Sequence, residues 1–256
     1  MGKPSSVVLS ALEFDVLWES ERLPRRHVAL DVPSPGRTHT ERDEMVGESW
    51  ESLRERGLVD ARRVEAEIAE DLALLAAPSV AIDAWVWTDH VISALAASSG
   101  TRAVLAVVDG DEVWLIPARD SSLAEAAISI AGQVPAGRGH SVRLPSDVLR
   151  DADIEADGDP ARLITCLDSR GITLSDAQVA VGMLAEASLR GQFGVQRRHR
   201  DGRVRRAERV VAFHDTAEGR YVYLTGPASD GCRWSTITPA DNNRLAACLW
   251  ELVGEF

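Results

Sequence analysis

The chain has 256 residues, a hydrophobic content of 45% and a formal net charge of −12. This length can bury a full hydrophobic core, as one large domain or as two fused halves. The negative charge argues against a broad surface for nucleic acids or anionic membranes. No segment approaches the roughly 20 apolar residues of a transmembrane helix, and the first residues lack the apolar run of a secretory signal.

Three helices are predicted in the first 78 residues. Ser10, with Glu13 three positions later, has the pattern of a capping box at the start of the first helix. Leu23-Pro24 ends this helix, since proline cannot continue it. The next two helices are expected from Thr40 to about Arg56 and from Asp60 to Pro78.

From Ser79 the hydrophobic period changes to two, which is typical of β-strands. Residues 79–117 predict an antiparallel meander of about four strands, with a turn at Thr88–His90 and a hairpin turn at Asp109-Gly110. A helix is expected over roughly 121–132.

The second half predicts the same order. Short helices are expected near Ser146 and from Asp159 to about Ser169, and a longer helix is expected from Asp176 to Arg190. The turn at Asp201-Gly202 is a hairpin signal. Strands are expected at about 192–200, 203–214, 219–225 and 233–238, and a closing helix at 240–253.

The strongest organisational signal is an internal repeat. Residues 101–131 and 219–253 share a strand, a turn, a second strand, a proline and a helix. The matching pairs are Trp114 with Trp234, Pro117 with Pro239, and Leu123-Ala124 with Leu245-Ala246. We therefore expect an α+β fold made of a quasi-twofold duplicated unit with a continuous antiparallel sheet. The expected halves are 1–139 and 140–256; the alternative is a chance match of a common arrangement.

No catalytic motif is present, and we predict no catalytic residue, metal or cofactor. The best nucleophile–base candidate is His214-Asp215 with Cys232 or Ser235, but adjacent strand residues point to opposite faces. The acidic residues of 151–159 lack the order of a calcium loop and are expected to form a solvated linker. The three cysteines, Cys166, Cys232 and Cys248, lack zinc spacing and are typical of reduced cytosolic thiols.

Residues 197–206 form an arginine-rich hairpin in this interpretation. Such a ribbon can contact phosphates, or it can be a solvated tip that prevents edge pairing. Because the chain is acidic and this hairpin lacks aromatic residues, an acidic protein partner is favoured over nucleic acid. The expected modulators of partner binding are Arg198, Arg200, Arg203 and Arg205.

Short motifs occur in a fixed order along nearly the whole chain. They are Leu12-Glu-Phe-Asp-Val-Leu-Trp18, Pro33-Ser-Pro-Gly-Arg-Thr38 with Glu41-Arg42, Ala94-Leu-Ala before Ala103-Val-Leu-Ala, Gly191-Gln-Phe-Gly194, Gly202-Arg-Val-Arg-Arg-Ala207, and Asp215-Thr-Ala-Glu-Gly-Arg-Tyr221 leading into Trp234-Ser-Thr. In this order they resemble the EspG family of type VII (ESX) secretion-associated proteins from actinobacteria. The resemblance implies a central antiparallel sheet flanked by two helical bundles. It also implies a cytosolic, non-enzymatic chaperone that binds the helical tip of PPE-type proteins in PE–PPE heterodimers.

For this function, we expect partner contacts on the second half, inferred from strand face and location. The expected residues are Met183, Ala187, Phe193, Val195, Val211 and Phe213, with Trp87 and His90 at the first hairpin as further candidates. The alternative functions are a nucleic-acid-binding regulator that acts through hairpin 197–206, and a hydrolase that uses His214.

Overall fold

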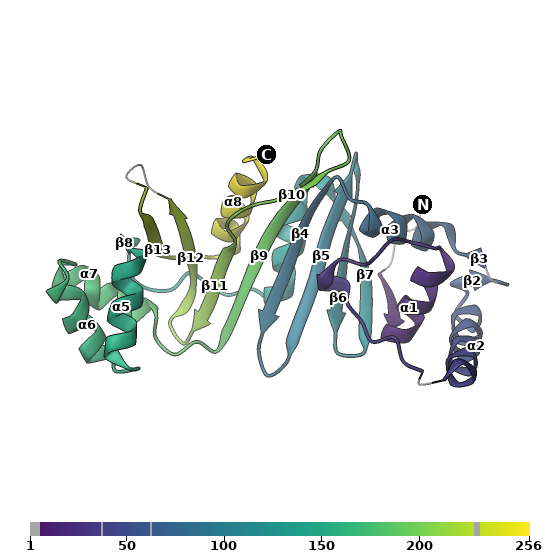
Figure 1. Cartoon of the computed structure of the whole chain (residues 1–256), viewed down its shortest axis with the longest axis horizontal. Helices are drawn as coiled ribbons and strands as arrows, with labels where there is room; N and C mark the ends of the chain where they lie inside the picture. The colour runs from purple at the N-terminus through teal and green to yellow at the C-terminus, as the bar shows by residue number, and fades with distance from the viewer. Residues whose placement is uncertain (1–5, 37, 62, 228–230) are drawn as a thin grey trace. The chain divides into compact units, whose positions relative to one another are not determined.

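The chain passes twice through one order of elements: an edge strand, three helices, a four-stranded meander and a closing helix (Figure 1). The computed structural model describes residues 6–36, 38–61, 63–227 and 231–256. It divides into two compact units. The first unit contains residues up to Trp85, Asp89–Ile130 and Val195–Arg206, and the second contains Val86–Thr88, Ala131–Gly194 and Ala207–Phe256. The proposed division into halves 1–139 and 140–256 stays a prediction.

The first pass through the chain gives four meander strands with three helices before them. Its main elements are β1 (Val7–Ser10), α1 (Ala11–Ser20), α2 (His39–Glu55), α3 (Ala66–Ala76), β4 (Val80–Trp87), β5 (Val91–Ser99), β6 (Arg102–Asp109), β7 (Glu112–Arg119) and α4 (Leu123–Ile128). Its minor elements are the 3-10 turns η1 (Val28–Leu30), η2 (Asp120–Ser122) and η3 (Ser129–Ala131), and the short hairpin of β2 (Val59–Asp60) and β3 (Arg63–Val64).

The second pass repeats this order and adds one short strand. Its elements are β8 (Val142–Pro145), α5 (Ser146–Ala156), α6 (Pro160–Ser169), α7 (Leu174–Met183), β9 (Leu189–Arg198), β10 (Val204–Arg206), β11 (Val211–Thr216), β12 (Gly219–Pro227), β13 (Arg233–Pro239) and α8 (Asn242–Val253). The added strand β10 pairs with β9, as the Asp201-Gly202 turn predicted.

Both meanders are antiparallel and both take their edge strand from the chain that precedes the helices. The neighbours are β1-β7-β6-β5-β4 in one case and β9-β11-β12-β13-β8 in the other. The predicted α+β class and the antiparallel sheet are confirmed. Because β1 pairs with β7 as β8 pairs with β13, the repeat includes an edge strand that the sequence comparison did not contain.

Strand register identifies the residues that correspond in the two passes. Pro117 pairs with Val104 and Pro239 pairs with Tyr221, and each partner is the third residue of its strand. Leu123 and Leu245 follow their prolines at the same spacing and both are buried. The two tryptophans do not correspond. With Pro117 aligned to Pro239, Trp234 is equivalent to Glu112, two residues before Trp114.

Several predicted helix boundaries differ from the structure for local reasons. The capping box of Ser10 and Glu13 is confirmed. The cap of α2 is Thr38 rather than Thr40, since the Thr38 hydroxyl accepts from the Glu41 amide. The cap of α3 is Glu65 rather than Asp60, because Asp60 pairs with Arg63 in the β2–β3 hairpin.

The largest error concerns α7, which was expected to run to Arg190. Thr173 caps this helix, which begins at Leu174 rather than Asp176 and ends at Met183. Residues 189–193 pair with β11, so strand pairing overrides the helix propensity of Leu189 and Arg190. The acidic residues of 151–159 are also not a linker, since α5 extends to Ala156 and Asp159 caps α6. The turn predicted between the last two strands includes residues 228–230, which lie outside the described residues.

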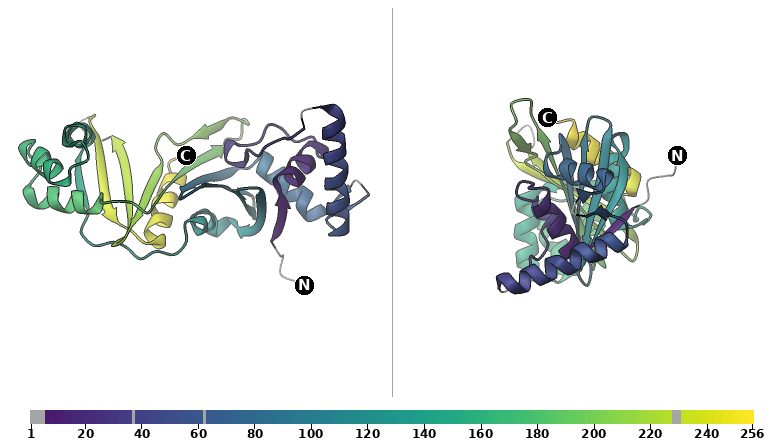
Figure 2. Two further views of the ribbon diagram at one scale, coloured as in Figure 1. Left: turned by 90° about the horizontal axis from the view of Figure 1, so that it is seen from below. Right: turned by 90° about the vertical axis from the view of Figure 1, so that its right-hand side faces the viewer.

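Each meander has two faces with different coverings. In the second unit, Tyr221 and Ile237 belong to a core cluster with residues of α5, α6 and α7. Side chains alternate along a strand, so Val211 and Phe213 point to the opposite face, where α8 packs on β11. We call the first face the helix face and the second the α8 face. Figure 2 shows α5, α6 and α7 gathered beside β8, at the edge of the second unit's strands.

Candidate binding groove of the second unit

The two units cover their helix faces differently. In the first unit, α3 and the η1 turn pack on β5 and β6, the middle of the meander. In the second unit, α5 and α7 pack on β13 and β8 instead, at the edge of the sheet. The helix layer is thus displaced from the middle of the meander toward its edge, and part of the helix face of β11 and β12 stays accessible.

Corresponding residues show this difference in burial. Leu95, Ala97 and Ala106 on β5 and β6 are completely buried. Their register counterparts on β11 and β12 are Ala212, His214 and Tyr223, and all three are only half-buried. The second unit therefore keeps an accessible sheet face where the first unit has a closed core.

The connection between the first two helices of each unit contributes to this difference. Residues 21–38 join α1 to α2 and include η1, whose Ala29 carbonyl accepts a buried hydrogen bond from Ser93 on β5. Only residues 157–159 join α5 to α6. The second unit has no segment of comparable length in this connection to fold over its sheet.

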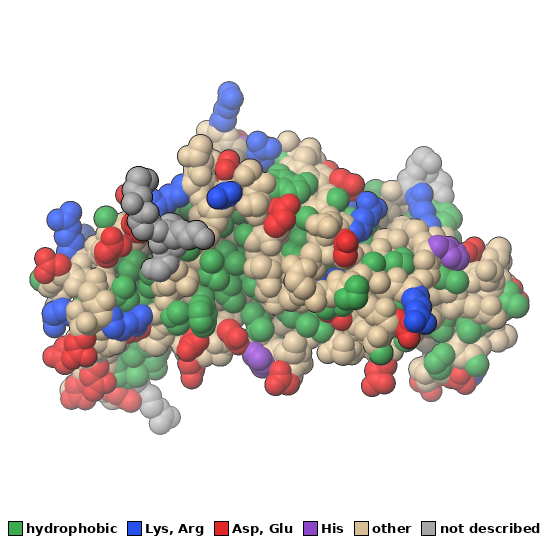
Figure 3. All heavy atoms as spheres, turned by 180° about the vertical axis from the view of Figure 1, so that it is seen from behind, with side chains coloured by type: hydrophobic (Ala, Val, Ile, Leu, Met, Phe, Trp, Pro, Cys, Tyr) green, Lys and Arg blue, Asp and Glu red, His purple; other side chains and the backbone are tan. Residues whose placement is uncertain are grey.

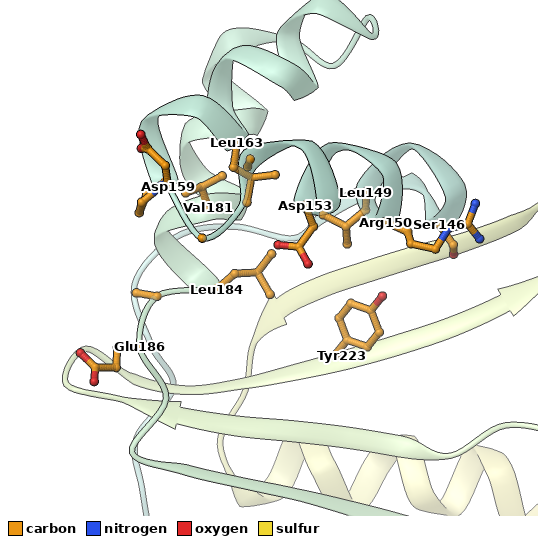
Figure 4. Close-up of a pocket in the computed structure, with 14 residues that line it drawn as sticks. Ser146, Leu149, Arg150, Asp153, Asp159, Leu163, Val181, Leu184, Glu186 and Tyr223 are labelled. Atoms are coloured by element: carbon orange, nitrogen blue, oxygen red, sulfur yellow. The ribbon is translucent and has the colours of Figure 1, made fainter.

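Two adjoining hollows occupy the accessible face, and together we call them the C-terminal groove. The larger, of about 680 Å³, lies between α5, α6, α7 and β12; the smaller, of about 290 Å³, lies over β9, β11 and β12. They share Leu184, Ala185 and Tyr223. In Figure 4, Tyr223 projects from its strand toward the side of α5 that carries Leu149.

The groove has an apolar interior and a charged rim. Leu149, Leu163, Val181 and Leu184 line the larger hollow. Asp153, Asp159, Glu186 and Arg150 stand among its polar lining residues. An apolar site with a few polar groups at its margin is typical of a recognition site, since apolar contact gives affinity and polar groups fix orientation.

Hydrogen bonds hold the polar residues of the groove floor in place. The Tyr223 hydroxyl is 2.7 Å from Ser235 Oγ, which is 2.8 Å from Ser146 Oγ. His214 Nε2 donates to the Met183 carbonyl oxygen at 2.7 Å, and the imidazole stacks on Tyr221. These contacts connect the floor to α5 and to the end of α7, so the groove is a preformed surface.

Two of the predicted contact residues line this groove and are accessible to solvent. Trp87 is 39% exposed, and both it and Ala187 line the smaller hollow. His90 is held elsewhere, with Nδ1 2.8 Å from Asp89 and Nε2 2.7 Å from Asp109. Hydrogen bonds to these two carboxylates raise the pKa of His90.

The other predicted contacts are interior residues. Phe193 and Phe213 stack with their ring centroids 5.4 Å apart and lie on the α8 face. Val195, Val211 and Met183 are also buried. A buried side chain reaches a partner only if neighbouring elements move, so a contact role for these five stays a prediction. Phe213 lines the smaller hollow although only 2% of it is exposed.

Sequence reasoning missed the groove-facing residues between these core positions. Arg190, Gln192 and Ala212 line the smaller hollow, one residue away from Gly191, Phe193 and Phe213. The missed signal was the alternation itself: on β9, polar Gln192 and Gln196 alternate with apolar Phe193 and Val195. The apolar set marks the core face and the polar set marks the accessible face.

The arginines of the predicted hairpin have different environments. Arg198 donates to the carbonyl oxygens of Pro78 and Gly202, at 3.3 Å and 3.1 Å, and is a structural residue. Arg200, Arg203 and Arg205 are exposed. Figure 3 shows basic side chains at the projecting tip of this hairpin.

The nucleophile–base candidate does not form a catalytic arrangement. His214 is bonded to the Met183 carbonyl, while Asp215 is paired with the buried Arg220 on the other face of the strand. In the part of the chain that the structure describes, no three His, Cys, Asp or Glu side chains gather as metal ligands. None of the helices within the described ranges is long and apolar enough to cross a membrane.

The N-terminal motif residues that carried the resemblance have structural roles. The Asp15 carboxylate is buried and accepts from Arg26, Ser34 and Arg42, at 2.7, 2.8 and 2.6 Å. These bonds attach Arg26 and Ser34 of the connection, and Arg42 of α2, to α1. The motif therefore specifies how the first unit covers its own sheet.

Comparison with known proteins agrees with this architecture. A model of the EspG family matches residues 10–251. The chain belongs to the EspG family. Among curated protein sequences, none matches this EspG family member.

One solved structure similar to this EspG family member is the Mycobacterium tuberculosis type VII secretion system chaperone EspG5 in complex with PE25-PPE41 dimer. The two chains share 15% sequence identity, with a TM-score of 0.75 over 95% of this chain and 94% of the other. At this identity the likeness concerns the fold.

Proposed function

We propose that this EspG family member is a cytoplasmic, non-enzymatic chaperone for type VII secretion. It binds the helical tip of a PPE-type protein within a PE–PPE heterodimer and keeps that tip out of water before export. Family membership and the complex formed by EspG5 support the class of partner. The observation that carries the proposal for this chain is the accessible helix face of β11 and β12.

The first unit supplies a guide to how such a partner binds. Its α3 helix places Leu72 and Leu75 in one core cluster with Leu95, Ala97 and Ala106 of the sheet. In the second unit, a helix supplied by the partner covers the corresponding Ala212, His214 and Tyr223. The partner's apolar side chains then fill the place that the chain's own helix fills in the first unit.

The mixed character of the groove suits reversible binding. Apolar area removed from water contributes roughly 25 cal/mol per Å², which favours capture of an apolar tip. Polar and charged lining residues such as Gln192, Asp153 and Glu186 are already accessible to water, so they limit the net gain. We propose Trp87 and Ala187 as contacts at the wall of the smaller hollow.

The decisive substitution is Ala185→Arg. Ala185 is exposed and lines both hollows, so an arginine side chain fills the groove without entering the core. The control is Ala217→Arg, which adds the same charge at the exposed β11–β12 turn outside the groove. In co-purification with a PE–PPE pair from the same organism, we expect A185R to lose the partner and A217R to retain it.

Circular dichroism of both variants accompanies this measurement, so that a loss of fold is distinguished from a loss of binding. Equal recovery of the partner by a folded A185R and by A217R excludes the groove. Absence of the pair from wild-type preparations contradicts the proposed function itself.

A further inference from the structure

The larger hollow of the C-terminal groove combines an apolar interior with a mainly acidic lining. Its charged lining residues are Arg150, Asp153, Asp159 and Glu186, and three of these four side chains are carboxylates. What the hollow attracts depends on which of these charges already have partners within the chain.

Two of the four charged side chains are engaged within the chain. Arg150 lies against Asp151, with its Nη2 and Nε atoms 3.0 Å and 3.1 Å from the Asp151 Oδ1 atom. Asp159 caps α6, and its Oδ1 atom accepts from the amides of Ala161 and Arg162 at 2.8 Å and 3.3 Å. Among the described lining residues, the one cation is therefore held by a neighbour that does not line the hollow.

The Asp153 carboxylate is in a different situation. Within the described ranges, it makes no hydrogen bond or ion pair. Asp153 follows Leu149 by one turn of α5, so the two side chains share one side of this helix. In Figure 4 the carboxylate points from α5 toward Leu184. An anion without a partner thus stands beside the apolar side chains that line the hollow.

This placement has opposite consequences for two kinds of occupant. A purely apolar segment removes water from the Asp153 carboxylate and supplies no replacement, so desolvation opposes binding. A segment that carries an arginine or lysine beside its apolar residues supplies a charge-assisted hydrogen bond, which offsets that cost. The hollow therefore discriminates by charge between segments of equal hydrophobicity.

We infer that the partner segment that enters the larger hollow carries an arginine or lysine that pairs with Asp153. This inference rests on the proposed function, because it concerns the same groove, and it adds the charge of the segment that binds there. Exposed Glu186 also lines the hollow without an ion pair in the described part of the chain, and it favours the same sign of charge.

The smaller hollow indicates where along the groove this basic residue belongs. Among its described lining residues, the Arg, Lys, Asp and Glu side chains comprise Arg190 alone. A second cation near Arg190 is disfavoured by repulsion between like charges. The partner's basic residue is therefore expected beside α5, in the larger hollow, and not above β9.

The test uses the full-length chain and a PE–PPE pair from the same organism, with dissociation constants measured by biolayer interferometry at low and at physiological salt. The variant D153A removes the carboxylate, and D153N removes its charge while keeping its shape. The matched control is D168A, the same change at an exposed position of α6 that does not line the hollow. Asp153 and Asp168 are both exposed, so these changes should leave the fold intact.

We expect D153A and D153N to bind the pair about tenfold more weakly than the wild type does at low salt, with a smaller difference at physiological salt. D168A should bind as the wild type does. If the occupant is purely apolar, D153A binds equally well or more tightly, because the desolvation cost is absent, and the inference is overturned. Equal weakening by D168A also overturns it, since the effect is then one of net charge.

Failure of the proposed function gives a different result from failure of this inference. If the wild type does not bind the pair, or if A185R binds it as well as the wild type does, the proposed function is contradicted and the inference falls with it. If A185R loses the pair while D153A and D153N retain full affinity, the groove remains the binding site and only the inference is wrong.

Charge reversal identifies the partner residue. Each arginine and lysine of the partner's helical tip is replaced in turn by glutamate and measured against D153K. We expect one of these replacements to bind D153K about tenfold more tightly than the unchanged partner does. The absence of recovery at every tip position overturns the inference.

Discussion

Arg220 and Asp215 form a bidentate ion pair in the interior of the second unit. Arg220 Nε and Nη2 donate to the two carboxylate oxygens at 2.7 Å and 2.8 Å, and the residues are 0% and 5% exposed. The same guanidinium donates to the carbonyl oxygens of Ala131 and Gly132 and to Asn242. One side chain thus joins β11, β12, the segment after α4 and the start of α8.

The first prediction is that Arg220→Ala lowers the free energy of unfolding by about 3–5 kcal/mol, because it leaves the Asp215 carboxylate buried without its partner. Urea denaturation measures this change. Arg138→Ala is the control: Arg138 is 87% exposed and pairs with Glu218, so its loss should cost less than about 1 kcal/mol. Similar losses from the two variants contradict the assigned role of Arg220.

The second prediction concerns Gly137, which lies against the ring of Tyr221. A Cβ atom at this position would be 2.1 Å from Tyr221 Cζ, and the Tyr221 hydroxyl is bonded to the Arg138 carbonyl oxygen. Gly137→Ala should therefore destabilise the chain by more than about 1 kcal/mol. Gly47→Ala, in the open interior of α2, should instead stabilise it by up to about 1 kcal/mol. Thermal unfolding of both variants tests the contrast, and the same sign of change in both would refute it.

The third prediction separates the two faces of β9. Phe193→Ala removes a buried ring that stacks on Phe213 and should cost about 3–5 kcal/mol. Gln192→Ala, on the accessible face, should change stability by less than about 0.5 kcal/mol. Guanidinium denaturation gives both values. A destabilisation at Gln192 as large as that at Phe193 would reverse the assignment of faces.

The fourth prediction is a pH dependence from His27. Burial lowers the pKa of His27, with Asp83 and Arg206 acting in opposite directions. Its Nδ1 also accepts from the Ala29 amide, which caps η1. The folded state favours the neutral imidazole. Once the pH falls below 6.5, the ordinary pKa of histidine, the unfolded state therefore binds more protons than the folded state does.

The contribution of His27 is therefore complete above about pH 6.5 and is lost as the pH falls through the lowered folded-state pKa. His27→Asn keeps a capping acceptor without titrating in this range. The loss of unfolding free energy between pH 7.5 and pH 5.5 should be smaller in H27N than in the wild type. An identical loss in both proteins would show that His27 is not responsible.

The sequence predicted the parts of the fold that depend on local pattern. The Ser10–Glu13 capping box and the Asp109-Gly110 turn need only neighbouring residues, and both are present. The end of α7 was missed because pairing with β11, far along the chain, determines the conformation from Leu189 onward. Local helix propensity depends on neighbouring residues and does not include that long-range pairing.

The groove could not be predicted from the sequence for a related reason. Tyr223 corresponds to the buried Ala106, and only the position of the helices relative to the strands distinguishes their burial. The sequence showed that hydrophobic and polar residues alternate on β9, but the apolar residues were predicted to contact the partner. The polar set, including Gln192, is the one that faces the groove.

The short connection at residues 157–159 has a consequence for how the two units evolve. In the first unit, the sheet residues Leu95 and Ala97 and their covering helix are encoded by one gene, so compensating changes on both sides arise in a single lineage. Under the proposed function, Ala212 and Tyr223 meet a surface encoded by another gene. Accepted changes at these positions should then be correlated between the two genes. Transfer of the chaperone gene without the partner gene should leave the first unit's core intact and the second unit's groove mismatched to the new partner.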